Sequence, residues 1–139
     1  AEEVEGMIGK FGEAVRRAIQ AGFDGVEIHG ANTYLIQQFY SPNSNQRDDE
    51  WGGSRDNRAR FPLAVLDITH KMASQYADDA FIIGYRFSPE EMEVPGIRFD
   101  DTIPQKRTPR LSMNSISYSF KNPAEVTKLK KCFRLPGST

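Results

Sequence analysis

Residues 23–29 (FDGVEIH) and residues 80–87 (AFIIGYRF) decide the fold of this chain. Each stretch is short and rich in apolar residues, which is typical of a buried β-strand. Between them, Phe61, Val65 and Ile68 recur at helical spacing, so the second strand follows the first through a helical crossover. Such a crossover joins parallel strands and is right-handed. The order therefore predicts a parallel βαβ unit, which occurs in both (β/α)8 barrels and doubly wound sheets.

Two further helical patterns surround this unit. Apolar residues recur every three or four positions over residues 4–21, and Gly22 is well placed to end that helix. A second helical patch covers residues 34–39. A long polar loop at residues 41–53 follows, and we interpret its Arg/Asp-rich part as solvated rather than as a binding site. No glycine-rich dinucleotide fingerprint or phosphate loop follows either predicted strand, which counts against the doubly wound alternative.

The crossover helix has a clear start and one irregular position. Ser54 is expected to cap its N-terminus, and Asp56 in the first turn favours the helix dipole. The apolar stripe continues to about Tyr76. Pro62 lies inside the pattern and predicts a kink or a split near Arg58, because proline lacks the backbone N–H that a helix interior needs.

The composition indicates a globular domain. The 139 residues are 38% hydrophobic and 27% charged, with a mean hydropathy of -0.58, which suits a chain with a real core. No apolar run approaches the roughly 20 residues that cross a bilayer, and the acidic start lacks the apolar region of a signal peptide. Cys132 is the single cysteine, so we expect no internal disulfide, and without a Cys/His cluster the sequence predicts no metal site. A reducing, cytoplasmic location fits these features.

Charge divides the chain into two parts. Residues 1–103 carry 10 Lys+Arg against 18 Asp+Glu, whereas residues 104–139 carry 8 basic residues and one acid, Glu125. We therefore expect a partial domain over residues 1–103 and a basic tail outside it. The tail pattern allows a short strand at residues 115–120 and a short basic helix at residues 124–133, but we expect it to pack poorly and to add no strand to the parallel sheet.

The ends of the two predicted strands carry the candidate functional side chains. His29 ends the first strand, Asn32 and Tyr34 follow in the same short loop, and Arg86 ends the second strand. The carboxyl ends of parallel strands meet at one edge of a sheet, where barrel enzymes place their catalytic groups. Because side chains alternate along a strand, His29 should share a face with Glu27, opposite the face that packs on helices.

Each of these residues also has a purely structural interpretation. A histidine at a strand end is often a hydrogen-bonding partner of nearby backbone, and Asn32 could simply stabilise a turn. Tyr34 could be a core aromatic, and Arg86 could pair with a carboxylate such as Glu27.

Two strings resemble a known family. Residues 21–63 (AGFDGVEIHGANTYLIQQFYSPNSNQRDDEWGGSRDNRARFPL) and residues 84–89 (GYRFSP) are similar to the old yellow enzyme family of FMN-dependent oxidoreductases, and the resemblance covers about residues 1–103. It implies a fragment of a (β/α)8 TIM barrel with about two parallel strands and their flanking helices. The resemblance also implies FMN as the cofactor, NADH or NADPH as the reductant, and an activated alkene such as an enone as the substrate.

The same resemblance assigns roles to the four candidate residues. His29 and Asn32 match the pair that holds the carbonyl oxygen of the alkene, where two N–H donors stabilise growing negative charge. Tyr34 matches the proton donor. Arg86 matches the cation beside the pyrimidine edge of the flavin, where positive charge favours the reduced ring.

The resemblance does not cover the tail. We expect this chain to be a truncated fragment that is inactive alone, because two strands do not close an eight-stranded barrel. Open edges on both sides of a two-stranded sheet also predict aggregation or loose folding. The alternatives are a non-catalytic remnant, or a binding role for the basic tail towards an acidic partner. The tail contains no folded nucleic-acid-binding motif, and the sequence does not predict an oligomeric state.

Overall fold

The computed structural model describes residues 2–102 and residues 116–120 of the chain. The elements follow one another in the order α1 (Glu2–Gln20), β1 (Gly25–Gly30), α2 (Leu35–Tyr40), α3 (Arg55–Tyr76), β2 (Ile82–Phe87), α4 (Phe99–Thr102) and β3 (Ile116–Phe120). No helix within these residues is long and apolar enough to cross a membrane.

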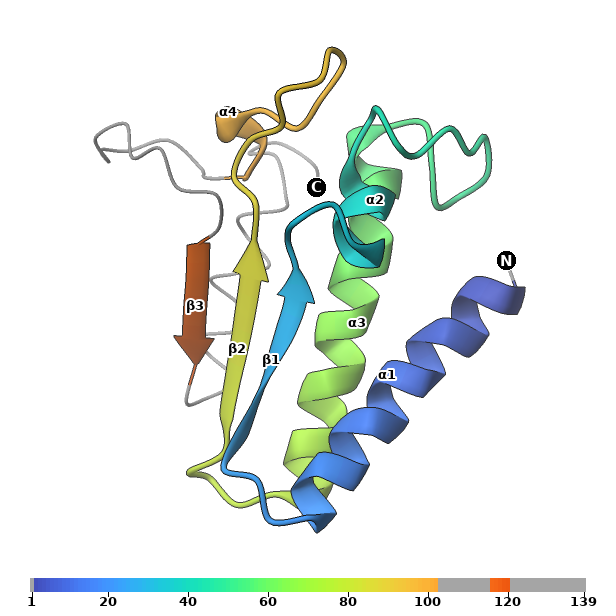
Figure 1. The fold of residues 1–139 in the computed structure, drawn as a ribbon. Coiled ribbons are helices and arrows are strands. Elements are labelled where there is room, and N and C mark those ends of the chain that lie inside the picture. The colour runs from blue at the N-terminus through green and yellow to red at the C-terminus, as the bar shows by residue number, and fades with distance from the viewer. Residues whose placement is uncertain (1, 103–115, 121–139) are drawn as a thin grey trace, which may run out of the picture.

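β1 and β2 are adjacent parallel strands joined through α3, which confirms the predicted βαβ unit (Figure 1). Their register runs from Gly25 beside Ile82 to Gly30 beside Phe87. α1 and α3 pack against each other beside these strands (Figure 1). One face of the strand pair therefore faces helices, and the other carries the polar residues predicted for it.

The core lies between the helices and that sheet face. Val26 and Ile28 belong to this core, as predicted for the side chains that alternate with Glu27 and His29. Its buried members come from all the main elements: Val4, Ile8, Ile28, Ile36, Phe61, Val65, Leu66, Ile83, Tyr85 and Phe87. One continuous cluster thus holds α1, α2 and α3 on the strands.

α1 ends where the sequence predicts. Gly22 adopts a left-handed backbone with φ 84°, which costs glycine little. The N–H of Gly22 donates to the carbonyl of Ile19 at 3.0 Å, and the N–H of Phe23 donates to that of Ala18 at 3.2 Å. These bonds satisfy carbonyls that the helix end would otherwise leave without partners.

α3 begins as predicted but is not split. The Ser54 hydroxyl accepts a hydrogen bond from the N–H of Asn57 at 3.1 Å, which confirms the predicted cap. Pro62 lies inside one continuous helix, Arg55–Tyr76, so the predicted split near Arg58 is wrong. Pro62 itself is buried, and its neighbours Phe61 and Val65 are fully buried in the core. We attribute the continuity to this packing, which offsets the loss of one backbone hydrogen bond.

The short strand that the tail pattern allows at residues 115–120 is present as β3, but it joins the sheet of β1 and β2, contrary to our expectation that the tail adds no strand there. β3 pairs antiparallel with β2, from Ile83 beside Phe120 to Phe87 beside Ile116. The sheet is therefore mixed, in the order β1-β2-β3, and the edge of β2 that we expected to be open is paired. Alternating β-branched and aromatic residues favour a strand whatever the charge of the surrounding segment. The basic helix predicted at residues 124–133 lies outside the residues that the structure describes.

Candidate active site

The carboxyl ends of β1 and β2 bring His29 and Arg86 side by side. The two residues are register partners in the parallel pair, so their side chains leave the same face of the sheet. Glu27 lies on that face too and forms an ion pair with Arg86. The structural interpretation of Arg86 as a partner of Glu27 is therefore confirmed. Both side chains are more than a third exposed, so this pair contributes little stability.

His29 is held with one ring nitrogen available as a donor. The N–H of Ala31 donates to Nδ1 of His29 at 3.4 Å, a long bond that nevertheless makes Nδ1 the acceptor. In a neutral imidazole, the other nitrogen then carries the proton. Nε2 of His29 can therefore donate to an oxygen placed at this edge.

Tyr34 stands next to His29 and does not enter the core. Its ring lies edge-on to the imidazole, with ring centroids 5.1 Å apart and an interplanar angle of 69°. Its side chain is 61% exposed, so the core-aromatic interpretation of Tyr34 is wrong. Tyr34 occupies the N-cap position of α2, which places it at the edge where His29 ends.

The loop between β1 and α2 has a strained backbone. Asn32 and Thr33 both have positive φ, 56° and 59°, a region that residues other than glycine rarely occupy. The N–H of Asn32 donates to the Ser88 hydroxyl at 3.0 Å, and the N–H of Thr33 donates to Oε1 of Gln37 at 2.9 Å. Strained residues cluster at functional sites when their surroundings fix them. Asn32 is exposed.

Three residues that support this loop were not singled out from the sequence. They are Gln37 on α2, Ser88 just after β2, and Glu91 in the following loop. Oε1 of Glu91 accepts from Nε2 of Gln37 at 2.8 Å, and Oε2 accepts from the Ser41 hydroxyl at 2.7 Å. A glutamate in a polar loop gives no sign of burial in the sequence. The one available signal was its position two residues after the string at residues 84–89.

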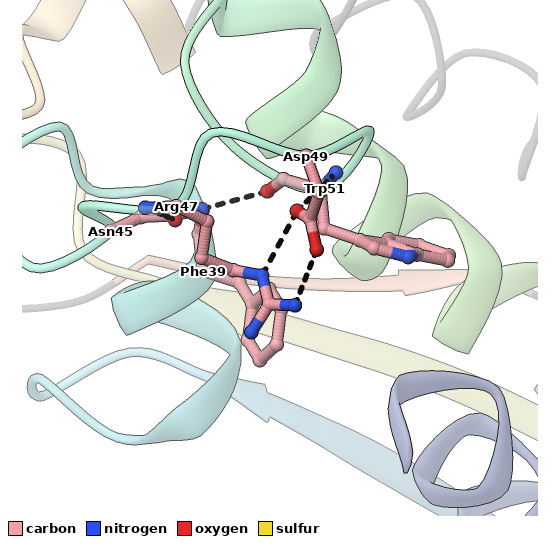
Figure 2. A network of polar contacts seen from close by, with 5 residues as sticks. All are labelled: Phe39, Asn45, Arg47, Asp49 and Trp51. Carbon is pink, nitrogen blue, oxygen red and sulfur yellow. Dashed lines mark hydrogen bonds and ion pairs between the residues drawn. The ribbon is translucent and has the colours of Figure 1, made fainter. Parts of the chain in front are cut away.

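The loop at residues 41–53 is organised around Asn45 (Figure 2). Nδ2 of Asn45 donates to the carbonyls of Phe39 at 2.6 Å and Trp51 at 2.8 Å, while its Oδ1 accepts from the N–H of Arg47 at 3.1 Å. The Arg47 guanidinium hydrogen-bonds to Asp49 and lowers the pKa of that carboxyl to about 2. Apart from the bond to the carbonyl of Phe39 in α2, these contacts lie within the loop and explain how a polar segment is ordered.

The far end of α2 is fixed by a second polar cluster. The Tyr40 hydroxyl donates to the carbonyl of Asp101 at 2.9 Å and accepts from Nε of Arg55 at 3.2 Å. Burial raises the pKa of Tyr40, so the phenol stays protonated as a donor. α2, α3 and α4 are tied together at this point, behind the edge that carries Tyr34.

The chain matches known proteins over most of its length. Residues 1–125 match the profile of the NADH:flavin oxidoreductase / NADH oxidase family. The chain is 94% identical over 102 residues to an NADH:fumarate oxidoreductase of Klebsiella pneumoniae (strain 342), a match that covers 73% of this chain and 11% of that protein. It is 68% identical over 102 residues to an NADH:acrylate oxidoreductase of Vibrio harveyi, covering 73% of this chain and 10% of that protein.

A solved structure agrees with these matches. Morphinone reductase in complex with tetrahydroNAD superimposes with a TM-score of 0.56 at 40% identity, over 64% of this chain and 23% of that one. The structural neighbours are TIM-barrel proteins of the old yellow enzyme type, so the chain has the fold of a barrel fragment. It spans no more than about a quarter of the length of any of these three relatives.

Proposed function

Because the chain belongs to the NADH:flavin oxidoreductase / NADH oxidase family, we propose that it carries the substrate-binding edge of an FMN-dependent enzyme that reduces activated alkenes with NADH or NADPH. The observation that carries this proposal is the pairing of His29 with Arg86 at the carboxyl edge of two parallel strands. Active sites of barrel enzymes form at this edge.

The donor groups fit a substrate carbonyl. FMN, when bound, supplies a hydride to the alkene carbon furthest from the carbonyl, and negative charge then grows on the carbonyl oxygen. In this proposal the Nε2–H of His29, whose Nδ1 accepts from Ala31, and the side-chain amide of Asn32 donate to that oxygen and stabilise the charge. In the same proposal the exposed phenol of Tyr34, whose ring lies beside that of His29, delivers a proton to the carbon next to the carbonyl, which completes the reduction.

Arg86 fits the flavin side of the same site. Its guanidinium lies on the sheet face that carries His29 and forms an ion pair with Glu27. A cation beside the ring favours the electron-rich reduced form of a flavin. The residue just before it on that face, Gly84, has no side chain to obstruct a planar group.

A second candidate function follows from the length of the relatives. The fumarate and acrylate oxidoreductases are about ten times longer than the matched segment, so their named acceptors do not identify the substrate of this edge. In this alternative, the site oxidises NADH with FMN, and the electrons leave to an acceptor held elsewhere in the protein. Tyr34 has no proton to deliver in that reaction.

Measuring the two half-reactions separately distinguishes these functions. In the FMN-loaded protein that contains this chain, Tyr34→Phe should slow oxidation of the reduced flavin by 2-cyclohexenone by 10²–10⁴-fold, roughly the contribution of one general acid. Reduction of the flavin by NADH should stay within about twofold. Equal loss in both half-reactions would remove Tyr34 as the proton donor, and no reoxidation by any enone in the parent protein would favour the second candidate.

We also propose that the 139-residue chain does not turn over alkenes by itself. Two parallel strands and one antiparallel strand, the strands found among the residues described, do not close a barrel around a cofactor. The isolated chain should therefore purify without yellow flavin. A stoichiometric flavin absorbance in the purified chain would overturn this.

A further inference from the structure

Glu91 is a buried carboxylate that lies beside the candidate site without facing it. It is 9% exposed, and it follows β2 by four residues. Oε1 accepts from Gln37, and Oε2 accepts both from the Ser41 hydroxyl and from the N–H of Ile97, at 3.0 Å. Burying a carboxylate is costly unless hydrogen bonds satisfy it, and three donors do so here.

Gln37 connects Glu91 to the loop between β1 and α2, which contains Asn32 and Thr33. The amide of Gln37 is 4% exposed and has one donating end and one accepting end. A carboxylate can only accept, so the NH2 group of Gln37 must face Glu91. That leaves Oε1 of Gln37 for the N–H of Thr33, which donates to it at 2.9 Å.

Thr33 is the residue between Asn32 and Tyr34. Its φ of 59° is unfavourable for a β-branched side chain and persists only if neighbouring contacts fix it. The hydrogen bond that the Thr33 N–H donates to Gln37 is one such contact. The Thr33 carbonyl accepts from Nε2 of Gln38 at 2.6 Å, and the neighbouring Asn32 N–H donates to the Ser88 hydroxyl. We propose that Glu91 is a positioning residue: through Gln37 it holds Thr33 and so sets where Asn32 and Tyr34 stand relative to His29. The catalytic value of this placement rests on the proposed function, whereas the placement itself does not.

Exchanging the two side chains provides the test. Glu91→Gln alone sets the new NH2 group against another donor whichever way the amide faces, either the NH2 group of Gln37 or the N–H of Ile97. Gln37→Glu alone sets two carboxylates against each other. The double variant restores every bond: the new amide at position 91 donates to the new carboxylate at position 37, which still accepts from Thr33. The oxygen of that amide still accepts from Ser41 and Ile97.

Two measurements report on the position of the loop that contains Thr33. Amide hydrogen exchange at Thr33 in the 139-residue chain should be about tenfold faster in each single variant and within about twofold of the parent in the double variant. The second probe is 4-hydroxybenzaldehyde, a phenol whose oxygen mimics the substrate carbonyl. In the FMN-loaded protein, affinity for this phenol should fall about tenfold in each single variant and recover in the double variant, with FMN affinity unchanged. Glu90→Gln is the matched control, because Glu90 is exposed and pairs with Arg98 at 3.8 Å.

The outcomes separate this inference from the proposed function. Exchange at Thr33 that is unchanged in the single variants, or not restored in the double variant, overturns the role of Glu91. If a single variant fails to fold, recovery of protection in the double variant remains the deciding result. If the parent protein binds no phenol, the proposed function fails while the exchange data still decide whether Glu91 positions the loop.

Discussion

The two faces of the β1–β2 pair are built from alternate residues of the same strands, yet they differ in almost every property. On one face, Ile28, Ile83 and Phe87 are each about 5% exposed and belong to the continuous core under α1 and α3. On the other face, the ion pair between Glu27 and Arg86 is more than a third exposed. The alternation of side chains along a strand is sufficient to separate a stabilising face from a chemical one.

Strain follows the same division. Among residues 2–102, the non-glycine residues with positive φ are Asn32 and Thr33, both in the loop that continues from the polar face. Hydrogen bonds to Ser88 and Gln37 hold these residues in place. We infer that the free energy gained by burying the apolar face offsets the backbone strain at Asn32 and Thr33.

The largest expected effect is a difference in stability between variants at two neighbouring residues, one on each face. Phe87→Ala should destabilise the chain by about 3–5 kcal/mol, because it opens a cavity in the core. Arg86→Ala, one residue earlier on the opposite face, should cost less than about 1 kcal/mol, because its ion pair is partly exposed. Urea unfolding followed by circular dichroism measures both. Equal losses of unfolding free energy in the two variants would show that the polar face contributes as much to stability as the buried face.

A smaller effect is expected on ligand affinity when the polar face loses His29 and Asn32. Replacing His29 and Asn32 together with alanine removes both proposed donors to an oxyanion, at roughly 1.5–3 kcal/mol each. Affinity of the FMN-loaded protein for 4-hydroxybenzaldehyde should therefore fall by at least about 100-fold. Titration of the ligand-induced flavin absorbance change measures this, while the flavin content should not change. Loss of FMN together with the phenol would instead assign the pair to cofactor binding.

The smallest effect concerns pH and lies away from both faces. Arg47 lowers the pKa of Asp49 from its ordinary value of 3.8 to about 2 in the folded chain. Because the folded value is the lower one, the pair stabilises the fold above about pH 4, and this contribution is lost as the pH falls towards 2. Asp49→Asn should remove that part of the acid dependence, and the effect should be small because the pair is exposed. Unfolding curves at pH 2 to 6 for parent and variant test it, and identical pH dependence would contradict it.

Features set by neighbours in the chain were predictable from the sequence. The end of α1 at Gly22 and the cap at Ser54 depend on hydrogen bonds within a few residues. The two buried strands and their parallel pairing followed from short apolar runs around a helical segment. The position of His29 beside Arg86 followed in turn, because parallel strands bring their carboxyl ends to one edge.

The βαβ unit could be predicted from the sequence, together with the alternation of its faces and the edge that His29 and Arg86 share, because each depends on local periodicity. The continuation of α3 through Pro62 and the pairing of β3 with β2 are visible only in the folded chain. The same is true of the burial of Glu91. These outcomes depend on packing and hydrogen bonds between segments far apart in the chain, where the energy gained can exceed a local preference of about 3 kcal/mol such as that of proline.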